Sequence, residues 1–434
     1  MAGIILSVDI GTSSLKASYI DLDGKQKAFA REPYGSYESG AESAEVKDAA
    51  AWEQAFILAL EKLHACAPCC PDAVCISGNG PTLVPVKADG EPLPPIHWYS
   101  GKSSLPVKGA GDPEAPSLFL PHVAWFKENS GGEYKKVKLF FSSHEWLANR
   151  LGSDAYTALP SSSYELYYWN EEQLRLYGLE SEKFPPFIKM GSAVGHVSKE
   201  AASFFSANRY LKSGIPIISG GPDFITALIG TAVKAPGEVC DRAGSSEGIN
   251  VCAASPVKGN GLRILPHAIE GLWNISVIIP ASGSLFEKYR TDTGQQNRPY
   301  EELLAELIPS SFIIPYSPLH TGRAVLCEIG FTVRSALKTL NNTGLAVSEM
   351  RLSGGQSRSA LWNQLKADII GVSLMVPEIS DGELAGNAVL AAAALEGISR
   401  DEAADKMIRI RDVYRPRNSE FWEEEYGKYE ENNR

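Results

Sequence analysis

The first 24 residues constrain the fold more than any other part of the chain. Residues 4–10 form a compact apolar run that predicts a buried β-strand, and residues 16–20 predict a second strand after a Gly-Thr-Ser-Ser turn. The Leu22-Asp23-Gly24 sequence has the Asp-Gly chemistry of another hairpin turn. The chain therefore begins with consecutive antiparallel strands, which the fold has to accommodate.

Strand and helix patterns alternate along the rest of the chain. Asp48 suits a helix N-cap, and apolar residues recur at helical spacing from Trp52 to Leu63. This alternation predicts an α/β fold. Further strands are predicted at 73–77, 216–219, 247–252, 325–329 and 350–352, and further helices after Asp223, from about Thr332, from Ser357 and over 420–431.

Length and charge limit the class of protein. A chain of 434 residues exceeds the size at which one hydrophobic core usually stops growing, which favours two domains. The net charge of -11 provides no basic field for nucleic acid or an anionic membrane. The start of the chain lacks a basic n-region, and no apolar stretch reaches the roughly 18 residues that span a bilayer. We expect a cytoplasmic protein with no nucleic-acid or membrane partner.

The seven cysteines, an odd number, fit reduced thiols better than a disulfide framework. Cys66, Cys69 and Cys70 include one C-x-x-C spacing, which can bind zinc or exchange disulfides. A second C-x-x-C is absent, and the cluster lies in a predicted connection from a helix to a strand. Ordinary thiols are therefore the favoured interpretation.

The turn after the first strand has the residue types of a phosphate site. Gly11 lets the backbone approach a phosphate, and Thr12 and Ser13 supply hydrogen-bond donors. The carboxylate of Asp9 can hold Mg²⁺ directly or through water. An ordinary β-turn is the alternative, because D-x-G-T also occurs by chance.

Asp223 follows a glycine pair at the end of a predicted strand. Phosphorylation of an alcohol needs a base that receives the hydroxyl proton, because an alcohol has a pKa far above 7. Asp223 is the candidate base. The alternative is a helix N-cap, a position that Asp fills well.

Two later runs have a similar character. Gly244-Ser245-Ser246 is a second glycine-hydroxyl turn, and the turns at Gly11 and Gly244 could be corresponding elements of two related domains. The run at residues 352–357 enters a predicted helix, whose first N–H groups can face a nucleotide. A tight strand-to-helix turn would explain the second run equally well.

The order of these runs resembles the FGGY carbohydrate kinase family, and its xylulokinase-like branch more than its glycerol kinases. Several ordered matches are more specific than any single one. They extend over almost the whole chain: Asp9-Ile-Gly-Thr-Ser-Ser, Ile76-Ser77-Gly78, Gly-Gly-x-Asp ending at Asp223, Pro236-Gly237-Glu238, Gly244-Ser245-Ser246, residues 351–362 and Ala385-Gly386-Asn387-Ala388.

This resemblance implies two actin/hexokinase-like (ribonuclease H-like) domains around an interdomain cleft. We assign 1–230 to an N-terminal domain with the sugar site and a phosphate hairpin. We assign 231–434 to a C-terminal ATP-binding domain, and we expect its final helix to pack back on the first domain. The implied cofactors are ATP and Mg²⁺, with Asp9 as metal ligand and Asp223 as catalytic base. The implied ATP contacts are Gly11, Thr12, Ser13, Gly244, Ser245, Gly354, Gly355, Gln356 and Ser359.

Departures from the family pattern cluster on the substrate side. Asn79-Gly80-Pro81 replaces Gln-Met-His, and Phe224 stands where a polar amide is common. After Trp98, Ser100 and Lys102 replace an Asp and an Arg. Polar groups that pair with sugar hydroxyls control specificity strongly, so these replacements predict an altered acceptor pocket. The expected pocket residues are Asn79, Gly80, Trp98, Lys102, Asp223 and Phe224.

The predicted function is ATP-dependent phosphorylation of a hydroxyl on a small sugar or polyol, with a xylulose-like ketose as first choice. A noncatalytic ATP- or sugar-binding regulator on the same scaffold is one alternative. An actin-like ATPase that needs no small acceptor is another. A homodimer is an option that the sequence leaves open.

Overall fold

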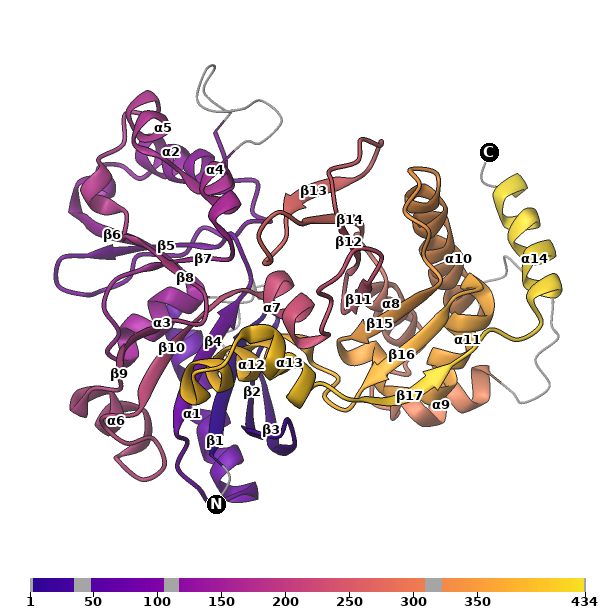
Figure 1. The fold of residues 1–434 in the computed structure, drawn as a ribbon, viewed down its shortest axis with the longest axis horizontal. Helices are drawn as coiled ribbons and strands as arrows, with labels where there is room; N and C mark the ends of the chain where they lie inside the picture. The colour runs from indigo at the N-terminus through magenta and orange to yellow at the C-terminus, as the bar shows by residue number, and fades with distance from the viewer. Residues whose placement is uncertain (1–2, 35–47, 105–116, 309–321, 433–434) are drawn as a thin grey trace. The chain divides into compact units, whose positions relative to one another are not determined.

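The computed structural model describes residues 3–34, 48–104, 117–308 and 322–432, and the chain divides into two compact units. Unit 1 contains Met1–Gly230, Ala268–Glu270 and Glu383–Met407. Unit 2 contains Thr231–His267, Gly271–Gly382 and Ile408–Arg434. Each unit has its own large sheet with helices packed on it (Figure 1).

Unit 1 is built on a six-stranded sheet with the order β3-β2-β1-β4-β10-β9. The central strands β1, β4 and β10 are parallel to one another, whereas β2, β3 and β9 are antiparallel to their neighbours. Two smaller sheets, β5-β6 and β7-β8, complete the unit. The strands are β1 (Ile4–Ile10), β2 (Ser14–Asp21), β3 (Gln26–Pro33), β4 (Ala73–Gly78), β5 (Leu83–Lys87), β6 (Val137–Ser142), β7 (Thr157–Leu159), β8 (Phe187–Lys189), β9 (Ala193–His196) and β10 (Pro216–Pro222).

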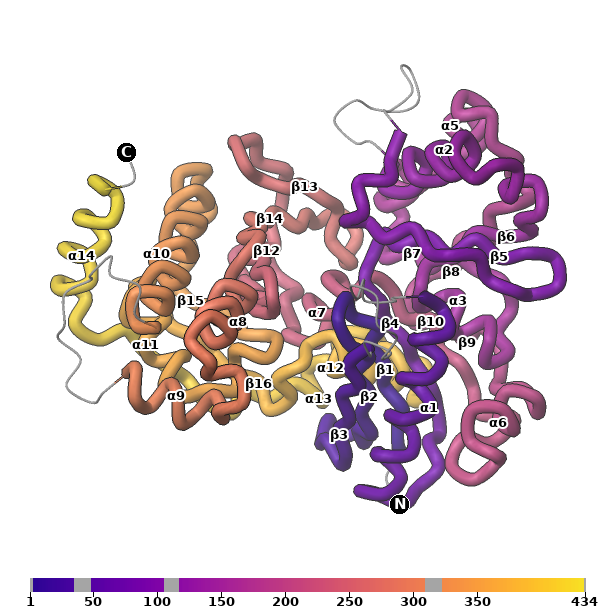
Figure 2. Tube along the Cα trace, turned by 180° about the vertical axis from the view of Figure 1, so that it is seen from behind, coloured from indigo at the N-terminus to yellow at the C-terminus, as the bar shows by residue number. Residues whose placement is uncertain are grey.

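Helices cover both faces of the central sheet, which is why β1 and β2 are buried along almost their whole length. α1 lies on one face, and α12 and α13 lie on the other (Figures 1 and 2). α1 begins after Asp48, whose Oδ1 accepts a hydrogen bond from Ala51 N at 2.9 Å. The helices of unit 1 are α1 (Ala49–Cys66), α2 (Leu120–Asn129), α3 (Ser143–Leu151), α4 (Glu165–Tyr168), α5 (Glu171–Leu176), α6 (Lys199–Ser206), α7 (Asp223–Gly230), α12 (Gly382–Glu396) and α13 (Arg400–Met407).

Unit 2 is built on a seven-stranded sheet with the order β13-β14-β12-β11-β15-β16-β17. Its strands are β11 (Val239–Ala243), β12 (Glu247–Ala253), β13 (Arg263–Pro266), β14 (Trp273–Ile279), β15 (Glu349–Ser353), β16 (Ser373–Pro377) and β17 (Ile410–Tyr414). Its helices are α8 (Gly283–Asp292), α9 (Tyr300–Leu307), α10 (Gly322–Asn341), α11 (Ala360–Ile370) and α14 (Ser419–Asn432).

The two units share one topology. The order β3-β2-β1-β4-β10 in unit 1 and the order β14-β12-β11-β15-β16 in unit 2 both read 3-2-1-4-5 when the five strands are numbered along the chain. The turn at Gly11 joins the first two of these strands in unit 1, and the turn at Gly244 joins the first two in unit 2. The predicted α/β class is confirmed, and the two turns occupy corresponding positions as the hypothesis of two related domains requires.

One predicted strand is wrong. Residues 325–329 lie inside the helix α10, and the helix expected from Thr332 is its continuation. Leu326, Ile329 and Val333 are buried at helical spacing against the core of unit 2. A short apolar run does not distinguish a buried strand from one side of a buried helix, which explains the error.

The final helix packs on unit 2, which corrects the expectation that it returns to the first domain. Phe331 of α10 lies against Trp422 and Tyr426 of α14, with ring centroids 6.1 and 5.8 Å apart. These buried aromatic side chains fix α14 to α10 because they need an apolar surface to cover them. The segment that rejoins unit 1 is formed by α12 and α13 instead.

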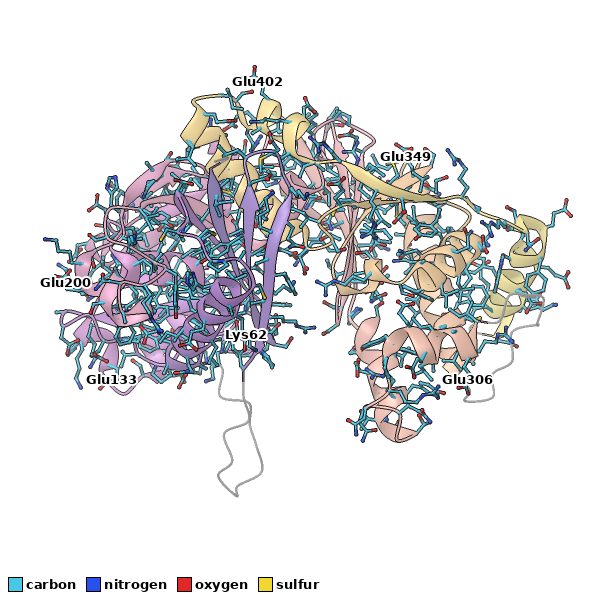
Figure 3. All side chains as sticks on the ribbon, turned by 90° about the horizontal axis from the view of Figure 1, so that it is seen from below. Lys62, Glu133, Glu200, Glu306, Glu349 and Glu402 are labelled. Atoms are coloured by element: carbon cyan, nitrogen blue, oxygen red, sulfur yellow. The ribbon has the colours of Figure 1, made fainter. Side chains whose placement is uncertain are left out.

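Charged side chains project from the surface of each unit, as Figure 3 shows for Glu133 and Glu200 in unit 1 and for Glu306 in unit 2. Within residues 3–34, 48–104, 117–308 and 322–432, no helix combines the length and the apolar character needed to cross a membrane.

Gly220 allows β10 to approach β4 closely. The register of these strands shifts between Ser219 and Pro222. A Cβ atom at position 220 would overlap the carbonyl oxygen of Ile76 and would lie 3.0 Å from Oδ1 of Asn387. Only glycine therefore fits at this position.

We predict that Gly220→Ala lowers the free energy of unfolding of unit 1 by about 1 to 3 kcal/mol, because backbone has to move to relieve the overlap. Urea denaturation followed by circular dichroism measures the change. Gly427→Ala is the matched control, since Gly427 lies inside α14 and a Cβ there meets nothing within 4 Å. Equal stability of Gly220→Ala and the unmodified protein would contradict the prediction.

Candidate active site

Three predicted site segments leave the sheet of unit 1 at the same edge. Ile10 of β1 and Pro222 of β10 are both in register with Gly78 of β4. The next residues along the chain, including Asn79 and Asp223, therefore follow strands that end side by side. In α/β sheets this carboxyl edge is where ligands bind.

Hydrogen bonds to the backbone of Gly11 hold the turn after β1 in place, while the tip of the turn is exposed. Gly11 N donates to Ser14 O at 3.1 Å, and the Tyr34 hydroxyl donates to Gly11 O at 3.1 Å. Thr12 and Ser13 are exposed at the tip. The backbone of this turn is therefore positioned without using the side chains of Thr12 and Ser13.

Asp9 is almost completely buried, and a relay of hydrogen bonds orients it. Ser77 Oγ donates to Asp9 Oδ1 at 2.8 Å, and Asn387 Nδ2 donates to Ser77 Oγ at 2.9 Å. Asn387 Nδ2 also donates to Val8 O at 2.8 Å, which fixes α12 to β1. Asp9 Oδ2 lies 3.8 Å from Lys16 Nζ.

The pKa of Asp9 is raised to about 7, chiefly because burial disfavours its charged form. The positive charge of Lys16 opposes this shift, whereas the negative charges of Glu383 and Asp223 add to it. Glu383 Oε2 also lies 4.0 Å from Lys16 Nζ. Asp9 and Glu383 therefore share one lysine, and Asp223 adds a further negative charge near Asp9.

The described residues contain no group of three or more His, Cys, Asp or Glu side chains placed to hold a metal ion. Mg²⁺ commonly binds through one or two carboxylates and takes its other ligands from substrate phosphates and water. Asp9 at the carboxyl edge, with Asp223 electrostatically coupled to it, fits that mode. Among the described residues, no set of protein ligands surrounds a metal ion on its own.

Asp223 is the first residue of α7 and is half-buried. Its Oδ1 accepts a hydrogen bond from Phe224 N at 2.6 Å, and the Phe224 side chain is buried. Asn79 is buried as well, with its N–H donating to Ile10 O at 2.8 Å. The Thr82 hydroxyl donates to Asn79 Oδ1. The structure thus brings Asn79, Gly80, Asp223 and Phe224 to one edge of the sheet.

Trp98 and Lys102 belong to the segment that follows β5. The Trp98 side chain is 48% exposed and contacts Tyr99 edge to face. Lys102 Nζ lies 5.5 Å from the ring centroid of Trp125 in α2. These contacts tie the segment to α2, so a role for Trp98 and Lys102 in the acceptor pocket stays a prediction.

Unit 2 brings its two predicted turns together with a third turn, at residues 282–284, that the sequence analysis did not predict. Ser282 N donates to Ser245 O at 3.1 Å, and Gly283 N donates to Gly244 O at 3.1 Å. Gly354 has φ +99°, and a Cβ there would overlap the carbonyl oxygen of Ala243. The turns at residues 244–246, 282–284 and 354–358 therefore form one cluster, with residues 244–246 exposed.

Gln356 and Ser359 use their side chains within the protein. Gln356 Nε2 donates to Gly244 O at 2.9 Å, and Gln356 Oε1 accepts from Trp362 Nε1 at 3.1 Å. Ser359 caps α11, with Trp362 N donating to its Oγ at 3.4 Å. Gly355 has open space around its Cα. The side chains of Gln356 and Ser359 are therefore engaged within unit 2, and contacts of this turn with ATP stay a prediction.

A buried ionic cluster lies under the turn at Gly244. Lys366 of α11 donates to Asp241 Oδ2 and, at 2.7 Å, to Glu247 Oε1. Ser282 Oγ donates to Glu247 Oε2 at 2.6 Å. Each of these four side chains is at most 1% exposed. The pKa of Asp241 is raised to about 7, chiefly because burial disfavours its charged form; the charge of Glu247 adds to this shift, and the charge of Lys366 opposes it.

Sequence reasoning missed several of these residues, namely Lys16, Ser77, Glu383, Asn387 and Lys366 as participants in the two clusters. Lys16 carried a usable signal, because it is the only basic residue of β2 and closely follows the predicted phosphate turn. Asn387 lay in the Ala385-Gly386-Asn387-Ala388 match, which indicated the family but not its partners. Lys366 carried no signal, since its partners lie more than 100 positions away in the sequence.

The cysteine cluster lies where the sequence predicted, at the end of α1 and in the connection to β4. Cys66 and Cys70 are exposed, Cys69 is half-buried, and all three are free thiols. The pKa of Cys69 is raised, chiefly by burial and also by the neighbouring Cys70 and Asp72. Its thiol is therefore less reactive than usual.

Comparison with known proteins gives matches over most of the chain. Residues 110–230 match the N-terminal domain, and residues 274–395 the C-terminal domain, of the FGGY family of carbohydrate kinases. The chain is 24% identical to a xylulose kinase of Staphylococcus epidermidis, covering 98% of this chain and 96% of the relative. It is 23% identical to an autoinducer-2 kinase of an Enterobacter species, covering 95% and 90%.

Solved structures share the fold. A xyloylose kinase from Brucella ovis superimposes with a TM-score of 0.77 at 20% sequence identity, covering 99% of this chain and 98% of that one. The predicted two-domain fold of the actin and hexokinase type is therefore confirmed, while the cleft between the domains stays a prediction.

The pKa of Asp241 yields a pH test. Its unfolded-state pKa is near 3.8 and its folded-state pKa is about 7, so the stability it contributes is present below pH 4 and is lost as the pH rises to 7. Asp241→Asn has no such titration. We predict that the stability of the variant relative to the unmodified protein increases by about 2 to 3 kcal/mol from pH 5 to pH 8. Denaturation at several pH values measures this difference, and a pH-independent difference would contradict it.

Proposed function

Because the chain belongs to the FGGY family of carbohydrate kinases, we propose that it transfers the γ-phosphoryl group of ATP to a hydroxyl of a small sugar or polyol. The observation that carries this proposal is the arrangement at the carboxyl edge of β1, β4 and β10. There, the open turn at Gly11, the buried Asp9 and the half-buried Asp223 leave the sheet side by side.

Asp223 is the proposed base. It would accept the proton of the acceptor hydroxyl while the new O–P bond forms, the bond between the β-γ bridging oxygen and the γ-phosphorus breaks, and ADP leaves. Its place at the first turn of α7 supports this role, because the N-terminal end of a helix favours a carboxylate that is ionised before the reaction. The hydrogen bond from Phe224 N to Oδ1 fixes the direction of the carboxylate.

Asp9 is the proposed ligand of Mg²⁺, which would neutralise charge on the phosphates. The protein's part is to hold the carboxylate in place, and Ser77 and Asn387 do so through their hydrogen bonds. Lys16, 3.8 Å from Asp9, would supply a second positive charge to the phosphates. The N–H groups of Gly11, Thr12 and Ser13 would contact the same phosphates.

Unit 2 is the proposed ATP-binding part. Gly244 and Ser245 would bind phosphate oxygens, and the backbone of Gly354 and Gly355 would face the adenosine end. The exposure of residues 244–246 supports a role in binding, because this part of the turn cluster is accessible while the groups beneath it are buried.

The acceptor is proposed to be a ketose or a related polyol. The relatives named above as xylulose kinase and autoinducer-2 kinase support a small polyhydroxy acceptor, and xylulose is the first candidate. Asn79 and Phe224 at the carboxyl edge would set the choice of acceptor. The amide of Asn79 can form a hydrogen bond with a hydroxyl of the acceptor, whereas the Phe224 ring cannot. A cytoplasmic location and a homodimer stay predictions.

A panel of pentoses, hexoses, polyols and cyclitols tests the proposal directly. Production of ADP is measured with and without each acceptor in the presence of ATP and Mg²⁺. Turnover that depends on an acceptor supports a kinase. Binding of ATP or sugar without any phosphorylated product would support a regulator, and hydrolysis of ATP unaffected by every acceptor would support an ATPase.

We predict that Asp223→Ala lowers kcat by about 10²- to 10⁴-fold, because the base is lost, while the affinity for ATP changes by less than about twofold. Steady-state kinetics and calorimetric titration with a nonhydrolysable ATP analogue measure the two effects. Asp401→Ala, which removes an exposed aspartate of α13, serves as the control and should leave both values unchanged. Full activity of Asp223→Ala would remove Asp223 from the mechanism.

A further inference from the structure

We propose that Lys366 is a positioning residue for the phosphate turn at residues 244–246, acting through the buried cluster beneath it. This inference rests on the proposed function of that turn in binding ATP. Lys366 itself is buried in unit 2 and would touch neither nucleotide nor sugar.

The first step of the argument concerns the two arms of the hairpin that carries the turn. Asp241 lies on β11 before the turn, and Glu247 is the first residue of β12 after it. Both carboxylates are buried, so their mutual repulsion is poorly screened by water. Lys366 bonds to both of them and so holds the two arms together.

The second step follows the hydrogen bonds from the cluster to the turn. Ser282 Oγ donates to Glu247 Oε2 at 2.6 Å and accepts from Gln356 Nε2 at 3.0 Å. Gln356 Nε2 also donates to the carbonyl oxygen of Gly244 at 2.9 Å. Lys366 is therefore connected to the turn backbone through three side chains.

The third step is that this path closes on itself. Gln356 Oε1 accepts from Nε1 of Trp362, which lies on α11 one helical turn before Lys366. One helix thus fixes the turn from two directions, through an ionic path and a neutral path. Such a closed arrangement, buried at Lys366 and half-buried at Gln356, restricts the turn to one geometry. Misplacement of a binding group by about 1 Å can cost about 10²-fold in activity.

The test compares the affinity of a nonhydrolysable ATP analogue for the unmodified protein and for Lys366→Met. We expect the Kd to rise about tenfold or more and the KM of the acceptor to change by less than about twofold. Lys338→Met is the matched control, since Lys338 is a half-exposed lysine of α10 that pairs with Glu430, and it should leave the Kd unchanged.

Lys366→Met leaves two buried carboxylates without their cation, which can prevent folding. A second variant keeps the test decisive in that case. Ser282→Ala cuts the path to Gln356 but leaves the ionic cluster whole. We expect a raised Kd and faster hydrogen exchange in residues 243–247 and 282–285, with no change in residues 11–14.

The outcomes separate the two proposals. If the unmodified protein does not bind the analogue, the proposed function of unit 2 fails. If it binds the analogue and a folded Lys366→Met binds it equally well, the positioning role of Lys366 is overturned while the proposed function stands. Where Lys366→Met does not fold, equal binding and unchanged exchange in Ser282→Ala overturn the positioning path from Lys366 through Ser282 and Gln356.

Discussion

The close approach of β10 to β4 is the constraint on which the candidate site of unit 1 depends. Glycine at position 220 allows the two backbones to meet, and the shift of register beside it delivers Asp223 to the same edge as Asn79. Asp9 lies one residue before the end of β1 at this edge. The separation of the candidate base and the candidate metal ligand is therefore set by backbone pairing, which is stiffer than any loop.

The two units use one topology, but the central lysines of their charged clusters differ in exposure. In unit 1, Asp9 and Glu383 share Lys16, which is partly exposed, and Asp223 adds negative charge near Asp9. In unit 2, Lys366 pairs with both Asp241 and Glu247 and is enclosed within the protein. The first arrangement suits a ligand with bound metal, and the second suits a rigid support for a turn whose backbone makes the contacts.

Much of this could be predicted from the sequence, because the informative features are local. The hairpin around Gly11, the strand before Asp223 and the helix after Asp48 each follow from neighbouring residues. The strand predicted at 325–329 failed because a short apolar run has no period of its own. The hydrogen-bond partners of Asn387 and the role of Lys366 could not be predicted, because they are set by the packing of distant segments.

The hydrogen bonds of Asn387 to Val8 and Ser77 have a consequence for the order in which the protein is made. Unit 1 includes residues 383–407, so its sheet lacks a cover on one face until nearly the whole chain has left the ribosome. Domains usually fold from the N-terminus as synthesis proceeds. Here the N-terminal unit is completed only after the strands of unit 2 up to β16 have been synthesised, and the orienting contacts to Ser77 beside Asp9 form only then.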